Sequence, residues 1–233
     1  MTLILCIETS TSVCSVSVSG DGEILSVREV TDAKSHASQL TPFITDALKE
    51  SGFTPRDLSA IAVSKGPGSY TGLRIGVSTA KGMAFALNVP LISVSTLLSM
   101  ASGFLEKHPD FSGNSKILLC PMIDARRMEV YSAIFNCKLK ELREIKAEII
   151  HPDSFLPLFR EKSIHFFGNG AMKCRDLIQN DSAFFHDGFH PSASYMTKHA
   201  NKKFNESKFE NLAYFEPFYL KDFVATIPVN KIF

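Results

Sequence analysis

The sequence predicts an α/β protein with two lobes, and two observations support this fold class. Short apolar runs alternate with amphipathic helical patterns along most of the 233 residues, as is typical of sheets covered by helices. A turn-rich stretch at residues 108–115 then divides the chain into two such sets of elements. We therefore expect a first lobe over residues 1–106, rejoined by about 212–226, and a second, smaller α/β lobe over 107–211.

The first lobe opens with three candidate strands, at Leu3–Glu8, Val13–Ser19 and Glu23–Val30. The turn signal Ser19-Gly-Asp-Gly22 joins the second strand to the third. These strands are expected to form an antiparallel meander.

Helices and strands then alternate. Apolar residues between Ala37 and Leu48 share one helical face, and Pro42 means either that the regular helix begins near Thr41 or that it is kinked at the proline. The elements expected next are a strand at Ala60–Val63, a helix at Thr71–Leu87, a strand at Pro90–Val94 and a helix at Thr96–Leu105. This order is the one expected of one half of the actin-like, Hsp70-like nucleotidase (ASKHA) fold.

The second lobe is predicted from a further series of apolar runs. Its strands are expected at Ile117–Ile123, Val130–Phe135, Leu139–Ile149 and Ile164–Phe167. Its helices are expected near Pro152–Phe159, Ala171–Ile178 and Ser194–Phe204, and the sequence shows no internal repeat. The C-terminal segment is expected to return to the first lobe.

The most informative segment is a Gly/Pro loop, Gly66-Pro-Gly68, that feeds directly into the Thr71–Leu87 helix. Ser69 or Thr71 can cap this helix, whose small residues recur every four positions: Gly72, Gly76, Ala80 and Ala84. Glycine costs roughly 1 kcal/mol relative to alanine inside a helix, so a close contact must compensate. Either the chain's own sheet presses against this stripe, or a helix of another chain lies across it.

Five motifs together resemble the TsaB (YeaZ) family. They are Ile4–Thr11, Lys65–Leu87, Asp124–Tyr131, Gly168–Ala171 and Tyr219–Ala225, and in order they cover nearly the whole chain. The resemblance implies a degenerate two-lobed ASKHA fold. Three departures weaken transfer of individual roles: Glu8 replaces the usual Asp, Lys221 the usual Arg, and His36-Ala-Ser-Gln39 the usual His-Ser-Glu.

The resemblance also implies two sets of functional residues. The motif residues are Glu8, Thr9, Ser10, Gly66, Pro67, Gly68, Ser69, Tyr70, Thr71, Asp124, Arg126, Glu129 and Tyr131. The residues expected at a partner interface, on the helices at about 36–50 and 71–87, are Leu40, Ile44, Ala47, Gly72, Leu73, Arg74, Gly76, Val77, Ala80 and Ala84. Arg74 can serve there as a polar anchor or can form a buried pair within the chain.

By this resemblance the chain is a non-catalytic scaffold subunit that pairs with TsaD and activates it. TsaD transfers a threonylcarbamoyl group to N6 of adenosine 37 in tRNA. Further implied partners are TsaE, through the TsaB–TsaD pair, a second copy of the chain when TsaD is absent, and tRNA indirectly. This chain alone is expected to bind no cofactor, whereas ATP and a metal ion are expected in the partner complex. The alternatives are a stand-alone actin-like ATPase and a glycoprotease-like metallopeptidase.

The candidate chemistry of the chain bears on those alternatives. Thr96 and Met100 stand where the catalytic paralogue TsaD carries a His-x-x-x-His metal pair, and a hydroxyl and a thioether make a poor metal site. The Walker motif is also missing. Glu8 can organise a metal and phosphate, or the neighbouring hydroxyl cluster of residues 9–12 can satisfy turn amides in a structural cap. His186 and His190 lie four residues apart, but Gly188 between them indicates a loop.

Charged residues form two further groups. Asp124, Arg126, Arg127 and Glu129 are expected in a turn with surface ion pairs. A basic stripe near the end is either a solvated helix face or a tRNA backbone contact, and it consists of Lys198, Lys202, Lys203 and Lys208.

Bulk composition sets outer limits on function. A net charge of +1 gives no general attraction to nucleic acid or membranes. The five cysteines are odd in number and lack Cys-x-x-Cys spacing, which indicates buried, reduced thiols. No run approaches the ~20 apolar residues of a membrane span, and the apolar start has no preceding basic region or cleavage-like end, so a cytoplasmic protein is expected.

Overall fold

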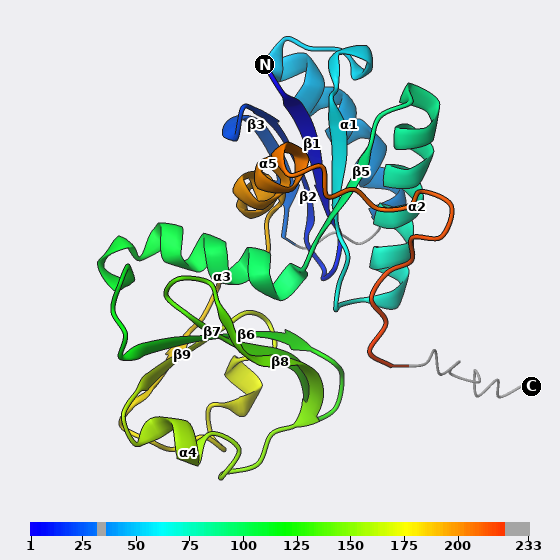
Figure 1. Ribbon diagram of the computed structural model, residues 1–233. Helices are drawn as coiled ribbons and strands as arrows, with labels where there is room; N and C mark the ends of the chain where they lie inside the picture. The colour runs from blue at the N-terminus through cyan, green and yellow to red at the C-terminus, as the bar shows by residue number, and fades with distance from the viewer. Residues whose placement is uncertain (32–35, 222–233) are drawn as a thin grey trace, which may run out of the picture.

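The first predicted lobe forms a mixed β-sheet in the computed structural model, which describes residues 1–31 and 36–221. Its strand order is β3-β2-β1-β4-β5, with β1, β2 and β3 antiparallel and with β4 and β5 parallel to β1 (Figure 1). The strands are β1 (Leu3–Glu8), β2 (Cys14–Gly20), β3 (Glu23–Val30), β4 (Ala60–Ser64) and β5 (Leu91–Val94). Asp21 and Gly22 form the predicted turn, both with positive φ.

Two long helices cover one face of this sheet. They are α1 (His36–Ser51) and α2 (Tyr70–Leu87), and a 3₁₀ turn at Pro55–Asp57 separates α1 from β4. Pro42 lies inside α1, so the alternative that the regular helix begins near Thr41 is wrong. Ser69 is the residue that caps α2, since its hydroxyl accepts the Gly72 N–H at 3.3 Å.

The second sheet repeats the topology of the first. Read from β8, its order is β8-β7-β6-β9-β10, with β6, β7 and β8 antiparallel and with β9 and β10 parallel to β6. Its strands are β6 (Ile117–Asp124), β7 (Glu129–Asn136), β8 (Glu141–Ile149), β9 (Ser163–Phe167) and β10 (Ala183–His186). The predicted two-lobed, actin-like α/β fold is confirmed, and the duplication that the sequence hides is visible in the strand order.

The helical connections of the second lobe are short, and three predictions there needed correction. The helix expected at 152–159 is only α4 (Leu156–Phe159), and the one at 171–178 is a 3₁₀ turn at Met172–Cys174. Strand β10 was not predicted. The helix expected at 194–204 is a 3₁₀ turn at Ala193–Met196 followed by α5 (Thr197–Asn205).

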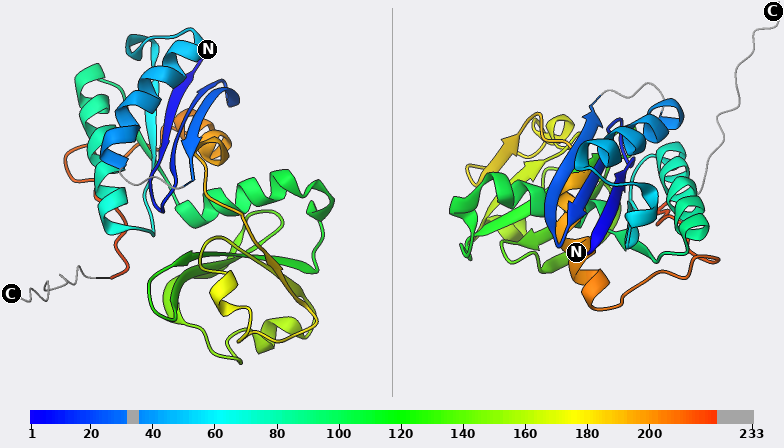
Figure 2. Two further views of the ribbon diagram at one scale, coloured as in Figure 1. Left: turned by 180° about the vertical axis from the view of Figure 1, so that it is seen from behind. Right: turned by 90° about the horizontal axis from the view of Figure 1, so that it is seen from above.

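The helix at the end of each sheet packs against the other sheet. Helix α3 (Thr96–Lys107) follows β5 and is itself followed by a 3₁₀ turn at Pro109–Phe111. It buries Leu97 and Phe104 in the core of the second lobe. Met196 and Ala200 pack against β1 and β5, on the face of the first sheet away from α1 and α2. Figures 1 and 2 show α3 crossing between the two sheets. The predicted lobe boundaries stay a prediction, although residues 193–205 lie against the first sheet.

The C-terminal segment runs back along the first lobe, as the view from behind in Figure 2 shows in orange to red. The Glu210 N–H donates to the Leu91 carbonyl at 2.8 Å, and Lys81 of α2 donates to the Phe215 carbonyl at 2.9 Å. Leu212 and Phe215 pack against the core under α1 and α2. The part of the predicted segment and of the terminal motif beyond residue 221 lies outside the described residues.

Two predictions from composition can be compared with the structure. All five cysteines are free and buried, and burial raises the pKa of the Cys6 thiol to about 12. Within residues 1–31 and 36–221, every helix is too short or too polar to cross a membrane.

Candidate functional site

A cleft of about 870 Å³ lies between the two lobes and collects the sequence motifs. Its walls come from the β1–β2 turn, the loop into α2, the β6–β7 turn and the C-terminal segment. The motif residues that line it are Ser10, Pro67, Gly68, Ser69, Tyr70, Thr71, Asp124, Arg126, Glu129 and Tyr131. Motifs separated by more than a hundred residues in the sequence therefore meet at one place.

The wall in the first lobe rests on a buried carboxylate. One oxygen of Glu8 accepts the Ser10 N–H at 2.6 Å and the Ser64 hydroxyl at 3.0 Å. The other oxygen is buried without a hydrogen-bond partner, and burial raises the pKa of this carboxyl. Glu8 thus satisfies one turn amide, and the Thr11 hydroxyl accepts another, from the Val13 N–H at 3.2 Å, as the structural alternative expected of the hydroxyl cluster.

The loop into α2 lies directly against this turn. The Ser69 N–H donates to the Ser10 carbonyl at 2.6 Å, and a Cβ atom at Gly68 would overlap that carbonyl. Gly66 has a φ of +105°, which a larger residue would rarely adopt. The two glycines of the loop are therefore required, Gly68 by close backbone packing and Gly66 by its left-handed backbone.

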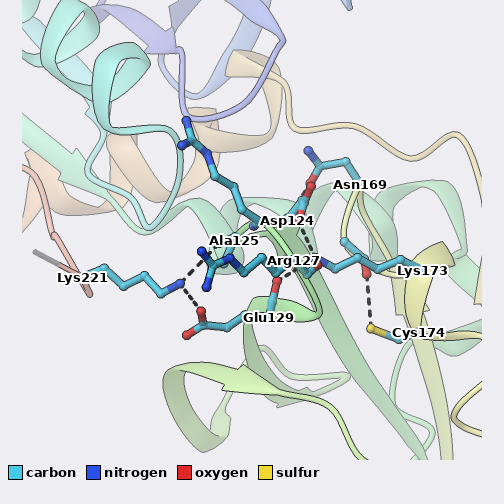
Figure 3. Close-up of polar contacts among 10 residues, drawn as sticks. Asp124, Ala125, Arg127, Glu129, Asn169, Lys173, Cys174 and Lys221 are labelled. Atoms are coloured by element: carbon cyan, nitrogen blue, oxygen red, sulfur yellow. Dashed lines mark hydrogen bonds and ion pairs between the residues drawn. The ribbon is translucent and has the colours of Figure 1, made fainter. Parts of the chain in front are cut away.

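The wall in the second lobe is a tight, charged turn (Figure 3). Asp124 pairs with Lys173 and accepts the Arg126 N–H at 2.9 Å, while Glu129 pairs with Lys221. The predicted turn does carry ion pairs, but their lysine partners come from distant parts of the sequence and not from the two arginines of the turn. Backbone φ is +70° at Arg126 and +53° at the following arginine, an uncommon pair of left-handed residues, and both side chains are exposed.

Tyr70 connects the cleft to the surface of α2. Its ring packs on Tyr219 of the C-terminal segment, with ring centroids 4.8 Å apart. Its hydroxyl accepts a hydrogen bond from Arg74 Nη1 at 3.2 Å. Arg74 is exposed, so it is not the buried intrachain pair that was one predicted alternative.

The other predicted interface residues do not form a surface. Leu40, Ile44, Ala47, Gly72, Leu73, Gly76, Val77, Ala80 and Ala84 are buried within the chain. A Cβ atom at Gly72 or Gly76 would overlap Thr9, the residue directly after β1, whose hydroxyl donates to the Gly72 carbonyl at 2.8 Å. The small-residue stripe therefore fits the chain's own sheet, and direct partner contact by these nine side chains is corrected to a role in placing α1 and α2.

The outer face of α2 is a second smooth surface that sequence reasoning missed. Ser78, Gly82, Phe85 and Ala86 are exposed there, and Phe85 is 79 % exposed. Nothing lies within 4 Å of a Cβ atom built at Gly82. The sequence did contain a signal for this surface. Gly82 lies outside the buried stripe of small residues, so a glycine at this position has no packing role within the chain.

Metal ligands are scarce among residues 1–31 and 36–221, which contain no group of three or more His, Cys, Asp or Glu side chains arranged to hold a metal ion. Thr96 and Met100 are fully buried, and Met100 belongs to the core of the second lobe. His186 contacts His165 at 2.9 Å between ring nitrogens. At the cleft, Asp124 is already ion-paired with Lys173.

The basic stripe is mostly engaged within the chain. Lys198 pairs with Glu106 at 2.9 Å, Lys208 pairs with a nearby glutamate, and Lys203 Nζ donates to the Ser93 carbonyl at 2.7 Å. These contacts favour the first alternative, a structural and solvated helix face, over the second, a surface that binds the tRNA backbone.

Comparison with known proteins gives a consistent result. The family model described as "TsaD: tRNA N6-adenosine threonylcarbamoyltransferase" matches residues 29–229. The chain is 32 % identical to the tRNA threonylcarbamoyladenosine biosynthesis protein TsaB of Escherichia coli, over 95 % of this chain and 96 % of that protein. It is 31 % identical to the Bacillus subtilis protein of the same name, over 76 % and 75 % of the two chains.

A solved structure agrees with these relatives. YeaZ from Pseudomonas aeruginosa superposes with a TM-score of 0.80 at 25 % identity, covering 94 % of this chain and all of that one. The match spans both lobes, and so includes the walls of the cleft. The chain belongs to the TsaB (YeaZ) family, whose curated members are named as tRNA threonylcarbamoyladenosine biosynthesis proteins.

Proposed function

We propose that this chain is a non-catalytic subunit in the transfer of a threonylcarbamoyl group to N6 of adenosine 37 in tRNA. In this role it pairs with a TsaD-type subunit and activates it. One observation carries the proposal. The chain has the TsaB fold, and one face of its α2 packs on its own sheet while the opposite face, built largely of small residues, is exposed to solvent.

The packing of α3 supports a non-catalytic role. Thr96 and Met100 stand where the family resemblance places the two metal-binding histidines of TsaD. Both side chains are fully buried, and a thioether in a hydrophobic core offers a hard cation neither charge nor a hydration path. ATP and the metal ion would accordingly belong to the partner's site.

The outer face of α2 is suited to close helix packing. Small residues at Ser78, Gly82 and Ala86 let the backbone of another helix approach, and Phe85 supplies a large apolar side chain beside them. Arg74 lies at the other end of the same face and can pair with a carboxylate. A second copy of the chain could use this face when TsaD is absent.

The further partners follow from the same assembly. TsaE would bind the TsaB–TsaD pair, and tRNA would be contacted mainly through TsaD, since this chain has a net charge of only +1. A cytoplasmic location fits free, buried thiols.

Calorimetric titration with TsaD from the same organism tests the proposal, using Gly82→Leu as the probe. The new side chain would point into open space, so the chain should fold normally. It would force the two docked surfaces apart at a cost of about 1–3 kcal/mol, a loss of roughly 5- to 150-fold in affinity. Lys202→Leu, an exposed position of α5 beyond the opposite face of the sheet, is the matched control and should bind like the wild type.

Two results would count against the proposal. Equal affinity of Gly82→Leu and the control would exclude the outer face of α2 as the docking surface. A wild-type chain that ignores TsaD but binds and hydrolyses ATP alone would replace the scaffold with the ATPase alternative.

A further inference from the structure

Residues 215–221 cross from one lobe to the other at the edge of the cleft. At the first lobe, the Phe218 N–H donates to the Lys65 carbonyl at 2.7 Å, next to the Gly-Pro-Gly loop. Lys81 of α2 holds the start of the segment through the Phe215 carbonyl. The segment is thus fixed to the same loop and helix that form one wall of the cleft.

At the second lobe, the segment ends on the charged β6–β7 turn. Lys221 Nζ donates to the Ala125 carbonyl at 3.3 Å and forms the ion pair with Glu129, as Figure 3 shows. Leu220 packs against the hydrophobic core of the second lobe. Phe218, Tyr219, Leu220 and Lys221 all line the cleft, so the segment forms part of its boundary.

A continuous set of contacts joins this segment to the outer face of α2. The exposed Arg74 bonds the Tyr70 hydroxyl, Tyr70 packs on Tyr219, and Lys221 follows two residues later. A carboxylate that captured the Arg74 guanidinium would therefore change the constraints on the Tyr70 ring and on the segment stacked against it.

We propose that Phe215–Lys221 is a strap that couples docking on the outer face of α2 to the opening of the cleft, with the Lys221–Glu129 ion pair as its latch. In the latched state the two walls of the cleft are tied together; in the released state Lys221 leaves Glu129 and the Ala125 carbonyl. Docking orders Tyr70 and Tyr219 and so favours the latched state, which reciprocally binds the partner more tightly. The coupling rests on the proposed function, whereas the latch does not.

Hydrogen exchange of the isolated chain tests the latch. Lys221→Met should speed exchange at least threefold at the Phe218, Ala125 and Glu129 amides, whose acceptors lie at the two ends of the strap. Glu129→Gln should reproduce this pattern, and the double variant should add little to either single variant. Lys140→Met, an exposed lysine of the same lobe, is the control. Unchanged exchange in both latch variants would overturn the latch.

Binding of TsaD then tests the coupling. Docking on the wild type should slow exchange of the Phe218 and Glu129 amides, and Lys221→Met should bind two- to fivefold more weakly although Lys221 lies outside the docking face. Tyr219→Ala should still bind TsaD but lose the slowing at Glu129. If TsaD binds and these amides do not respond, the coupling is refuted. If TsaD does not bind, both the proposed function and the coupling are refuted. The latch is still tested, because its hydrogen-exchange experiment uses the isolated chain.

Discussion

Two glycines of α2 should respond in opposite ways to the same substitution. Gly76 faces Thr9, the residue directly after β1, and an added Cβ would overlap the Thr9 hydroxyl, whereas a Cβ at Gly82 meets nothing within 4 Å. Both residues lie in the interior of the same helix, so the intrinsic gain from replacing glycine by alanine is the same, about 1 kcal/mol. The difference between the variants therefore isolates the contact with the sheet.

The size of the difference follows from that contact. At Gly76, forcing a methyl group into the packed interface costs about 1–3 kcal/mol. Displacing Thr9 also breaks its buried 2.8 Å hydrogen bond to the Gly72 carbonyl, at about 1–3 kcal/mol more. After the helical gain, Gly76→Ala should lose about 1–5 kcal/mol of unfolding free energy, while Gly82→Ala gains up to about 1 kcal/mol.

Thermal and urea unfolding followed by circular dichroism measure both variants. For a chain of this size, 1 kcal/mol corresponds to about 2–4 °C in Tm, so Gly82→Ala should unfold slightly above the wild type and Gly76→Ala clearly below it. Equal stabilisation by the two substitutions would refute the close packing of α2 on Thr9. It would also restore the small-residue stripe as a free surface.

Three smaller predictions follow from other parts of the molecule. Burial and the neighbouring His186 lower the pKa of His165 from 6.5 to about 4, so the unfolded chain binds more protons between these values and stability should fall as pH drops from 6.5 to 4. His165→Phe should flatten that slope in urea titrations at pH 7 and 5. Ser69→Ala should lower Tm by about 2–4 °C, because loss of an N-cap costs about 1 kcal/mol. The buried thiols should resist a thiol reagent at pH 8 in the native protein and all react in guanidinium.

The sequence located the first lobe well because its signals are local. Alternating apolar residues, the Ser19–Gly22 turn and the Ser69 cap define elements that agree with the structure to within about a residue at most ends. The second lobe was harder. Helices there are reduced to short turns that carry little periodicity. Strand β10 is as short as β5, but its residues are only partly buried, whereas all four residues of β5 are buried and form a clear apolar run.

The cleft was predicted only as separate motifs. Nothing local indicates that Asp124 pairs with Lys173 or Glu129 with Lys221, since these partners lie 49 and 92 residues apart. The same limit applied to α2. A stripe of glycines indicates that another segment approaches the helix closely, but the sequence does not say whether this segment belongs to the same chain. The folded structure shows that Thr9 of the same chain makes the contact.

The order of the two sheets explains why a cleft exists at all. Both sheets have the same strand order. Helix α3, which follows β5, packs on the second sheet, and α5, which follows β10, packs on the first, so these two helices hold the lobes together. At the opposite edge the lobes are joined by the strap and its ion pair with Glu129. A partly exposed ion pair is weak, worth about 1 kcal/mol or less, in contrast to the buried cores under α3 and α5. A modest binding free energy on α2 is therefore sufficient to shift this contact, while the packing of the lobes stays intact.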